Sequence, residues 1–250
     1  MNLDVTLTPA ELAGLAKRDL RSAVCVVFDV LRATSAFVTA LQNGAAAIIP
    51  VSEIPEALEI KRRRPTVLTA GERYGIKIRT EGHEFEFGNS PREFLPEKVK
   101  DQTIVSTTTN GTRALRACAG AKTVLAAAFL NLGATAKWVR EKSPENVLLI
   151  CAGTGENAAL EDILAAGALC ESLLRGTNAP SLSDSARVAL SAFEQARANL
   201  PQAICQSENA LRLLSIPELR PDVEFCLRQN VCSLVAGMKE DEMRKFDAAS

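Results

Sequence analysis

Polar side chains that could bind an anion or a cation follow an apolar run near the start of the chain. Asp29 comes directly after the run 24–28, and Arg32 follows three residues later. Thr34 and Ser35 stand where the cap of a helix is expected. An ionised carboxylate at a buried strand end is costly unless it is paired or bound to a cation. The stretch therefore indicates that Asp29 and Arg32 hold a partner or a ligand.

A second polar loop follows a predicted strand at residues 103–105. It consists of Thr107, Thr108, Thr109, Asn110, Gly111 and Thr112. Backbone N–H groups and hydroxyls at the start of a helix receive phosphate and other oxyanions, and the guanidinium of Arg32 could bind the same anion through two hydrogen bonds. The alternatives are a polar turn made of good capping residues and a surface ion pair for Arg32.

Two adjacent acids, Glu161 and Asp162, lie near the start of a predicted helix. Together with Asp29 they could offer three carboxylates to a hard cation, and oxygen ligands without histidine or thiolate suit Mg²⁺ better than Zn²⁺. The alternative is that both acids only complement the dipole of the helix, which would stabilise it by roughly 0.3–1 kcal/mol.

Several common phosphate-handling motifs are absent. The chain has no Gly-Lys dipeptide, hence no Walker A loop, and no G-x-G-x-x-G. Its one histidine, His83, stands among glutamates, and nothing near it indicates a catalytic triad. Hydrolysis of phosphate monoesters needs accelerations of up to ~10²¹-fold, of which anion-binding amides supply only a few kcal/mol. A metal ion is therefore expected beside Asp29.

Strands and helices alternate along most of the chain, which predicts a mixed, largely parallel α/β sheet flanked by helices. In such a sheet the loops at the carboxyl ends of the strands gather on one edge. The loops 28–35, 106–112 and 151–162 should therefore meet. The predicted strands are 24–28, 46–51, 66–70, 103–105, 123–127 and 146–150, and the predicted helices between and after them are 34–43, 52–63, 112–119, 131–142 and 158–175.

The predictions are coarser in three other segments. Ser90-Pro91 is expected to open a helix towards Val99, and residues 176–183 are the expected linker. Residues 184–214 predict two helices separated at Pro201, which could cover a cleft or form the seam of a homodimer, and 223–227 predicts a last strand. The 250 residues are expected to form one α/β unit, with two lobes, 1–130 and 131–250, on either side of a ligand cleft.

Composition limits the class of partner. Lys and Arg number 29 against 30 Asp and Glu, and the pI is about 6.0, so no nucleic-acid partner is expected. The seven cysteines form no C-x-x-C pair and indicate buried thiols in a reducing compartment. No apolar run approaches the ~18 residues of a membrane helix, and the first residues do not resemble a signal peptide. We expect a soluble cytoplasmic protein that does not bind a membrane.

The motifs together resemble the 2-phosphosulfolactate phosphatase family. The resemblance implies a Mg²⁺-dependent phosphohydrolase that acts on (R)-2-phospho-3-sulfolactate, a step in coenzyme M biosynthesis, on an α/β fold with the ligand between two lobes. Two departures are the charged segment 77–87 before Gly88, and Ala159, where a serine is common. The matching motifs are 28–35, 71–73, 88–91, 107–112, Asn131, 151–153 and 161–162, with weaker similarity at 222–226.

This resemblance leads to a hypothesis for each site residue. Asp29, Glu161 and Asp162 would hold Mg²⁺, with Asp29 and Arg32 as the catalytic residues. The substrate would be a small anionic phosphorylated molecule. A non-catalytic binding protein for a phosphorylated metabolite or nucleotide is the alternative, because it needs the same amide loops and no carboxylate cluster. The expected substrate-binding residues are Thr34, Ser35, Thr107, Thr108, Thr109, Asn110, Gly111, Thr112 and Asn131, with Arg73, Asn89 and Ser90 on the sulfonate or carboxylate.

Overall fold

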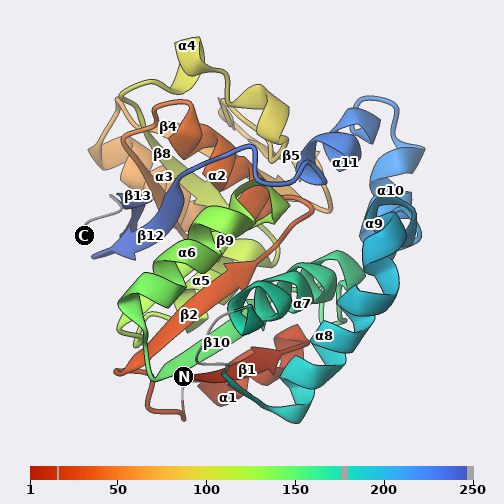
Figure 1. The fold of residues 1–250 in the computed structure, drawn as a ribbon. Coiled ribbons are helices and arrows are strands. Elements are labelled where there is room, and N and C mark those ends of the chain that lie inside the picture. Colours follow the sequence, from red (N-terminus) through yellow and green to blue (C-terminus); the bar gives the residue numbers. More distant parts are fainter. Residues whose placement is uncertain (16, 176–179, 247–250) are drawn as a thin grey trace.

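The computed structural model describes residues 1–15, 17–175 and 180–246, and its mixed α/β architecture confirms the predicted class (Figure 1). The strands are β1 (Asn2–Thr6), β2 (Ala23–Phe28), β3 (Ala47–Pro50), β4 (Leu68–Arg73), β5 (Ile76–Lys77), β6 (Arg79–Thr80), β7 (His83–Glu84), β8 (Thr103–Thr107), β9 (Thr123–Ala127), β10 (Asn146–Cys151), β11 (Ser181–Leu182), β12 (Val235–Lys239) and β13 (Glu242–Phe246). The α-helices are α1 (Leu12–Leu15), α2 (Ala33–Gln42), α3 (Ile54–Arg63), α4 (Pro96–Val99), α5 (Gly111–Ala117), α6 (Leu132–Lys142), α7 (Leu160–Leu174), α8 (Asp184–Ala196), α9 (Leu200–Ile204), α10 (Glu208–Ser215) and α11 (Arg220–Cys226).

Two groups of parallel strands and one hairpin make up the main sheet. The strand order is β11-β1-β10-β2-β9-β12-β13-β3-β8-β4-β5. The first five strands pair in parallel, as do β3, β8 and β4. The antiparallel hairpin β12–β13 joins the groups by pairing with β9 and β3. Strands from both sides of residue 130 thus share one sheet, and the predicted lobes 1–130 and 131–250 are not confirmed.

Alternate side chains of β2 point into two different cores, as the period of a strand requires. Val24, Val26 and Phe28 belong to a cluster with residues of α6, α7 and α8. Cys25 and Val27 belong to another cluster on the opposite face, with residues of α1, α2 and α5. Because both faces of β2 are covered, its whole length is apolar. Only the loop beyond its carboxyl end can carry polar groups to a ligand.

The predicted last strand at 223–227 is wrong, because this segment forms α11. Pro221 stands in the first turn of that helix, where its missing N–H costs nothing, and Val223 and Cys226, three residues apart, are buried on one face. The last strands are instead β12 and β13. Their pairing partners β9 and β3 lie far away in the sequence, so local pattern alone does not identify them.

Other expected boundaries also change. The segment 90–99 forms a 3₁₀ turn (Pro91–Glu93) and the short helix α4 in place of one helix, because Pro96 interrupts it. Pro201 stands in the first turn of α9, which begins at Leu200, and the segment 184–214 contains the three helices α8, α9 and α10 in place of two (Figure 1). Of the expected linker, residues 176–179 lie outside the described residues, and β11 pairs with β1 at the edge of the sheet.

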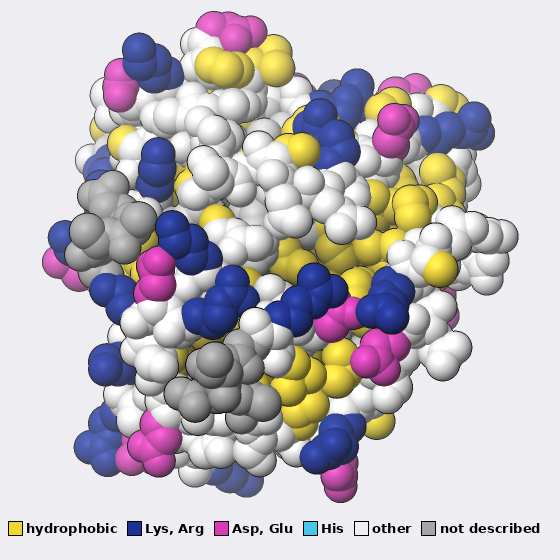
Figure 2. Space-filling view, in the orientation of Figure 1, with side chains coloured by type: hydrophobic (Ala, Val, Ile, Leu, Met, Phe, Trp, Pro, Cys, Tyr) yellow, Lys and Arg dark blue, Asp and Glu magenta, His cyan; other side chains and the backbone are white. Residues whose placement is uncertain are grey.

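The surface shows no separation of charge on the face in Figure 2, where Lys and Arg side chains alternate with Asp and Glu side chains. Among the described residues, no helix is both long enough and apolar enough to cross a membrane. Both observations agree with the near-zero net charge and the mixed polarity of the sequence.

The crossing of α7 and α8 depends on Gly167. A Cβ at this position would lie 2.1 Å from the backbone oxygen of Ala189. Gly167→Ala should therefore lower the free energy of unfolding by about 1–3 kcal/mol through overpacking, measured by denaturant titration. Gly14→Ala is the matched control, because a Cβ on Gly14 meets nothing within 4 Å, and it should leave stability unchanged or raise it by up to about 1 kcal/mol. Equal effects of the two substitutions would contradict this packing.

Candidate active site

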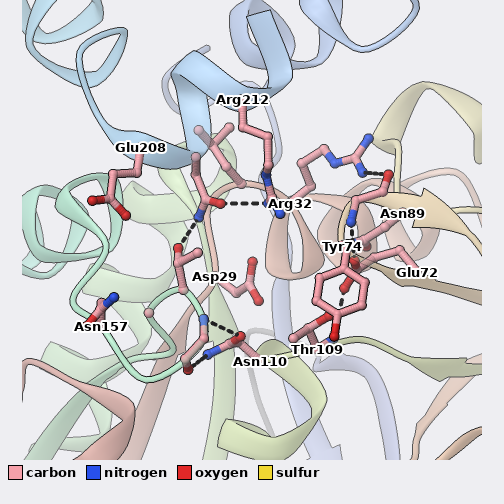
Figure 3. A pocket seen from close by; sticks show the side chains of 16 residues that line it. Asp29, Arg32, Glu72, Tyr74, Asn89, Thr109, Asn110, Asn157, Glu208 and Arg212 are labelled. Carbon is pink, nitrogen blue, oxygen red and sulfur yellow. Dashed lines mark hydrogen bonds between the residues drawn. The ribbon is translucent and has the colours of Figure 1, made fainter. Parts of the chain in front are cut away.

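A cavity of ≈ 230 Å³ opens at the carboxyl ends of the parallel strands. It is lined by residues of the loops after β2, β8 and β10, so the three loops predicted to converge do meet (Figure 3). Residues at the end of β4 and on α10 complete the wall. The cavity thus lies between the two groups of parallel strands, where one loop from each side can contact the same small molecule.

Asp29 lines this cavity and is fixed by the first turn of α2. Its Oδ1 accepts a hydrogen bond from the Ala33 N–H at 3.0 Å, and its backbone N–H and C=O both bond to the hydroxyl of Thr34. Gly111 lies against the carboxyl group, since a Cβ there would be 2.6 Å from Asp29 Oδ2. Only glycine at the start of α5 therefore allows the two polar loops to approach this closely.

The environment of Asp29 favours its neutral form. Burial first, and then the carboxylates of Glu72 and Glu161, raise the pKa of Asp29 to about 7 against the lowering effects of the Ala33 N–H and Arg32. The pKa of Asp162 is also raised, by burial first and then by Glu161 and Asp29. Asp29 thus has the acidic neighbours Glu72 and Glu161, and a bound cation would stabilise their negative charge.

Glu72 is a site residue that the sequence did not single out, although it stands within the motif 71–73. Its Oε1 accepts the N–H of Thr109 at 2.8 Å and its Oε2 accepts the N–H of Gly75 at 2.6 Å. Glu72 is buried and lines the cavity. It holds the loop of residues 107–112, the threonine loop, against the end of β4.

The two acids of α7 have different partners. Both oxygens of Asp162 are bonded to backbone N–H groups, Oδ1 to Val30 at 2.8 Å and Oδ2 to Gly153 at 3.0 Å, so Asp162 ties the loops after β2 and β10 together. Glu161 is 1% exposed; its Oε1 accepts the Asn209 amide, and its buried Oε2 has no hydrogen-bond partner in the part of the chain that the structure describes. Within the described ranges, no three His, Cys, Asp or Glu side chains converge as a ready-made metal site. Metal binding by Asp29, Glu161 and Asp162 stays a prediction.

Arg32 lines the cavity and also forms a buried ion pair with Asp222. Its Nη1 donates to Asp222 Oδ2 at 2.7 Å, and its Nη2 donates to the carbonyl of Gly75 at 2.9 Å. The other oxygen of Asp222 accepts the hydroxyl of Ser90 at 2.7 Å. Arg32 is 3% exposed and Asp222 is fully buried, so the surface ion pair considered for Arg32 is wrong. Ser90 contacts Asp222 and does not line the cavity.

Only part of the threonine loop faces the cavity. Thr109 and Asn110 line it, and the buried hydroxyl of Thr109 has no partner among the described residues. The Asn110 side chain donates to the carbonyls of Ala152 and Gly155, which binds this loop to the one after β10. Thr108 and Thr112 bond to each other at the start of α5.

The remaining predicted residues have structural roles. Thr34 and Ser35 lie inside the first turn of α2 instead of capping it, and their hydroxyls bond to the carbonyls of Asp29 and Val30. Outside the lining of the cavity stand Thr34, Ser35, Arg73, Ser90, Thr107, Thr108, Gly111, Thr112, Asn131, Glu161 and Asp162, while Asp29, Arg32, Asn89, Thr109 and Asn110 line it. Arg73 bonds to Ser52 and Thr107, and Asn131 bonds to backbone groups in the core.

Helix α10 contributes three lining residues that sequence patterns did not reveal: Glu208, Asn209 and Arg212 (Figure 3). The Asn209 amide donates to Glu161 Oε1 at 2.9 Å and also to the hydroxyl of Thr154. Its carbonyl oxygen accepts Arg212 Nη2 at 2.7 Å. The part of segment 184–214 that borders the cavity is thus α10, and the homodimer stays a prediction.

Comparison with known proteins agrees with this arrangement. The family model described as 2-phosphosulpholactate phosphatase matches residues 10–241. The chain belongs to this family. A relative from Caldanaerobacter subterraneus subsp. tengcongensis, named "Probable 2-phosphosulfolactate phosphatase", is 41% identical over 91% of this chain and 92% of its own. Relatives of the same name from Thermotoga petrophila (43% identical, 84% of this chain and 86% of its own) and Carboxydothermus hydrogenoformans (37%, 94% and 92%) are similar.

The carboxylate of Asp222 contacts two arginines, of which Arg32 is buried and Arg92 is exposed. Arg32→Met should lower the free energy of unfolding by about 3–5 kcal/mol, because it leaves Asp222 buried beside only one exposed cation. Arg92, whose side chain is 43% exposed, also contacts Asp222, at 3.3 Å. Arg92→Met should cost less than about 1 kcal/mol. If denaturant titrations show that both variants lose the same free energy of unfolding, the buried pair does not contribute more to stability than the exposed one, and the prediction is wrong.

The raised pKa of Asp29 predicts how stability depends on pH. The folded value of about 7 exceeds the ordinary 3.8, so the contribution is fully present below pH 3.8 and is lost as the pH rises through about 7. In EDTA, the free energy of unfolding should therefore fall over this window, by up to about 4 kcal/mol from Asp29. Asp29→Asn should flatten the slope, while Asp19→Asn, at an exposed acid whose pKa is lowered to about 2, should not. Identical slopes in both variants would contradict the prediction.

Proposed function

We propose that this protein hydrolyses the phosphate monoester of 2-phospho-3-sulfolactate to 3-sulfolactate and inorganic phosphate. Membership of the 2-phosphosulpholactate phosphatase family and the names of the relatives support phosphatase activity. Water adds its oxygen to phosphorus, the bond between phosphorus and the ester oxygen breaks, and the released alkoxide takes a proton. This substrate connects the activity with coenzyme M biosynthesis, which the family resemblance implies.

One observation carries the proposal: the Asp29 carboxyl faces a cavity whose walls also hold anion-binding groups. Arg32, the unpartnered hydroxyl of Thr109 and the side chain of Asn89 line the same space. A phosphate beside Asp29 would therefore meet a guanidinium and hydroxyl and amide groups on one side and carboxylates on the other. Phosphoryl transfer needs this combination, because both the anion and the groups that act on it must be positioned together.

Mg²⁺ fits the residues in a modified form of the predicted site. Mg²⁺ in phosphate sites is commonly held by one or two carboxylates, water and the substrate's phosphate, so a preformed cluster of three acids is not required. Asp29 and Glu161 are the proposed ligands, because Glu161 Oε2 is buried without a partner and both carboxylates raise the pKa of their neighbours. When bound, the ion would neutralise charge on the phosphate and polarise it for attack.

The other residues position the reactants. Asp162 holds the loops after β2 and β10 at a fixed separation through Val30 and Gly153. Asp222 holds the guanidinium of Arg32 in the cavity wall, so that its fork geometry is fixed before an anion binds. Glu72 fixes the backbone of Thr109 in the same way. These buried partners preorganise the site and reduce the entropy lost when the substrate binds.

Asp29→Asn should lower the rate of phosphate release from 2-phospho-3-sulfolactate by at least about 100-fold, because an amide cannot supply the charge that the site needs. Circular dichroism and the unfolding midpoint should show that the variant folds. Asp19→Asn, at an exposed aspartate far from the cavity, should turn over like the unmodified protein. Near-normal turnover by Asp29→Asn would refute the assignment.

The metal is tested in the same assay with and without EDTA, followed by addition of MgCl₂. Loss of phosphate release in EDTA and its recovery with Mg²⁺ is the expected result. Phosphate release that continues in EDTA would refute the Mg²⁺ dependence, while the proposed phosphatase activity would still hold. Tight binding of the substrate with no release under either condition would favour the alternative function, a non-catalytic binder of a phosphorylated metabolite.

A further inference from the structure

The cavity contains one cation that the proposed hydrolysis does not use. The charged side chains that line it are Asp29, Glu72 and Glu208 on the acidic side and Arg32 and Arg212 on the basic side. Arg32 is neutralised by Asp222. Among the described residues, Arg212 lies within ion-pair distance of no carboxylate, and its one hydrogen bond is to the neutral side chain of Asn209. Arg212 thus supplies the uncompensated positive charge of the cavity.

Arg212 is held in this position by a chain of contacts. Asn209, which accepts its Nη2, donates in turn to Glu161 Oε1, so the amide cannot rotate without breaking both bonds. Helix α10 itself is capped by the hydroxyl of Ser207 and anchored by the buried Ala210. Arginine has five N–H donors, and one bond to Asn209 leaves the others for a ligand. Arg212 is an exposed residue, so these donors can reach a ligand, and a guanidinium is suited to binding a carboxylate or a similar oxyanion through two hydrogen bonds.

Arg212 reaches the cavity from helix α10, whereas Asp29 reaches it from the loop after β2. A Cβ built on Gly75 would lie 3.9 Å from both Arg212 Cζ and Arg32 Nη2, so the two guanidinium groups border the same part of the cavity. Figure 3 shows Arg212 descending from α10, while Asp29 rises from the β2 loop and Glu208 points away from Arg212. Arg73, which was expected to bind the sulfonate or carboxylate, is bonded to Ser52 and Thr107 and does not line the cavity.

We propose that Arg212 binds a second acidic group of the substrate, a sulfonate or carboxylate, and so selects phosphorylated acids over phosphate monoesters without such a group. This inference rests on the proposed function, because it assumes that the phosphate lies beside Asp29. The substrate class is then a small molecule with a phosphate ester on one carbon and an acid on a neighbouring carbon. The ≈ 230 Å³ cavity has room for a molecule of a few carbon atoms.

The test compares two substrates in two variants. Arg212→Met keeps an unbranched side chain without its charge, and Arg187→Met removes an exposed arginine of α8 outside the cavity. Phosphate release is measured from 2-phospho-3-sulfolactate and from glycerol 2-phosphate, which carries no second acid. In Arg212→Met, the ratio of kcat/KM for the two substrates should fall by about 10- to 100-fold, mainly through a higher KM for the acid. Arg187→Met should keep the ratio, and Arg212→Lys should restore part of it.

Two kinetic outcomes would overturn the inference. An unchanged ratio would show that Arg212 does not contact the second acid. An equal fall in kcat/KM for both substrates would show that Arg212 acts on the phosphate or on the fold. Circular dichroism of each variant separates a folding defect from a change in selectivity, and a folding defect shared with Arg212→Lys would also count against the inference.

A binding measurement distinguishes failure of this inference from failure of the proposed function. The affinity for 3-sulfolactate, which carries a sulfonate and a carboxylate but no phosphate, is measured by calorimetry and does not depend on turnover. If the unmodified protein hydrolyses neither substrate, the proposed function fails. Weaker binding of 3-sulfolactate by at least about tenfold in Arg212→Met, and not in Arg187→Met, would still support the inference. Equal affinities in the two variants would overturn it.

Discussion

The buried ion pair between Arg32 and Asp222 joins segments 190 residues apart in the sequence and fixes the geometry around the cavity. One carboxylate holds the guanidinium in the cavity wall and also the hydroxyl of Ser90, next to the lining residue Asn89. Removing a partner from such a pair leaves an uncompensated charge in a low-dielectric environment. The loop after β2 and helix α11 are therefore coupled, and the C-terminal helices take part in building the site rather than only covering it.

Hydrogen bonds to the backbone explain why so many polar side chains of the motifs do not contact the cavity. Asp162 and Glu72 accept hydrogen bonds from backbone N–H groups of neighbouring loops, and Thr108 accepts one from Thr112 in the first turn of α5. Burying a polar group without a partner is costly, so loops that meet at a sheet edge need such bonds to stay in place. Among the described residues, three buried side-chain atoms have no hydrogen-bond partner, and two of them, Glu161 Oε2 and Thr109 Oγ1, belong to residues of the proposed site.

The arrangement also places selection and chemistry on different parts of the chain. The groups proposed to act on the phosphate come from loops after β2 and β8 and from α7, which belong to the largely parallel core. The residue proposed to bind the second acid comes from α10, in a segment that follows this core. Asn209 connects the two by bonding to both Glu161 and Arg212. A change in α10 can therefore alter substrate choice while the strands and their loops keep their contacts.

Local patterns in the sequence were sufficient for the alternating strands and helices of the core, for the convergence of three loops and for Asp29 as a buried carboxyl at a strand end. Such features depend on apolar periodicity and on the rule that parallel strands end at one edge. The ion pair of Arg32 with Asp222 and the presence of Arg212 in the cavity could not be predicted, because both depend on how α11 and α10 pack against the distant loop after β2. The hairpin β12–β13 was not predicted either. It pairs with β9 and β3, which lie far away in the sequence, and the local pattern carries no signal of such pairing. The sequence by itself thus determined the scaffold and the carboxylate at its centre, while the tertiary structure decided which side chains face the cavity, because burial and long-range hydrogen bonds assign each polar group its partner.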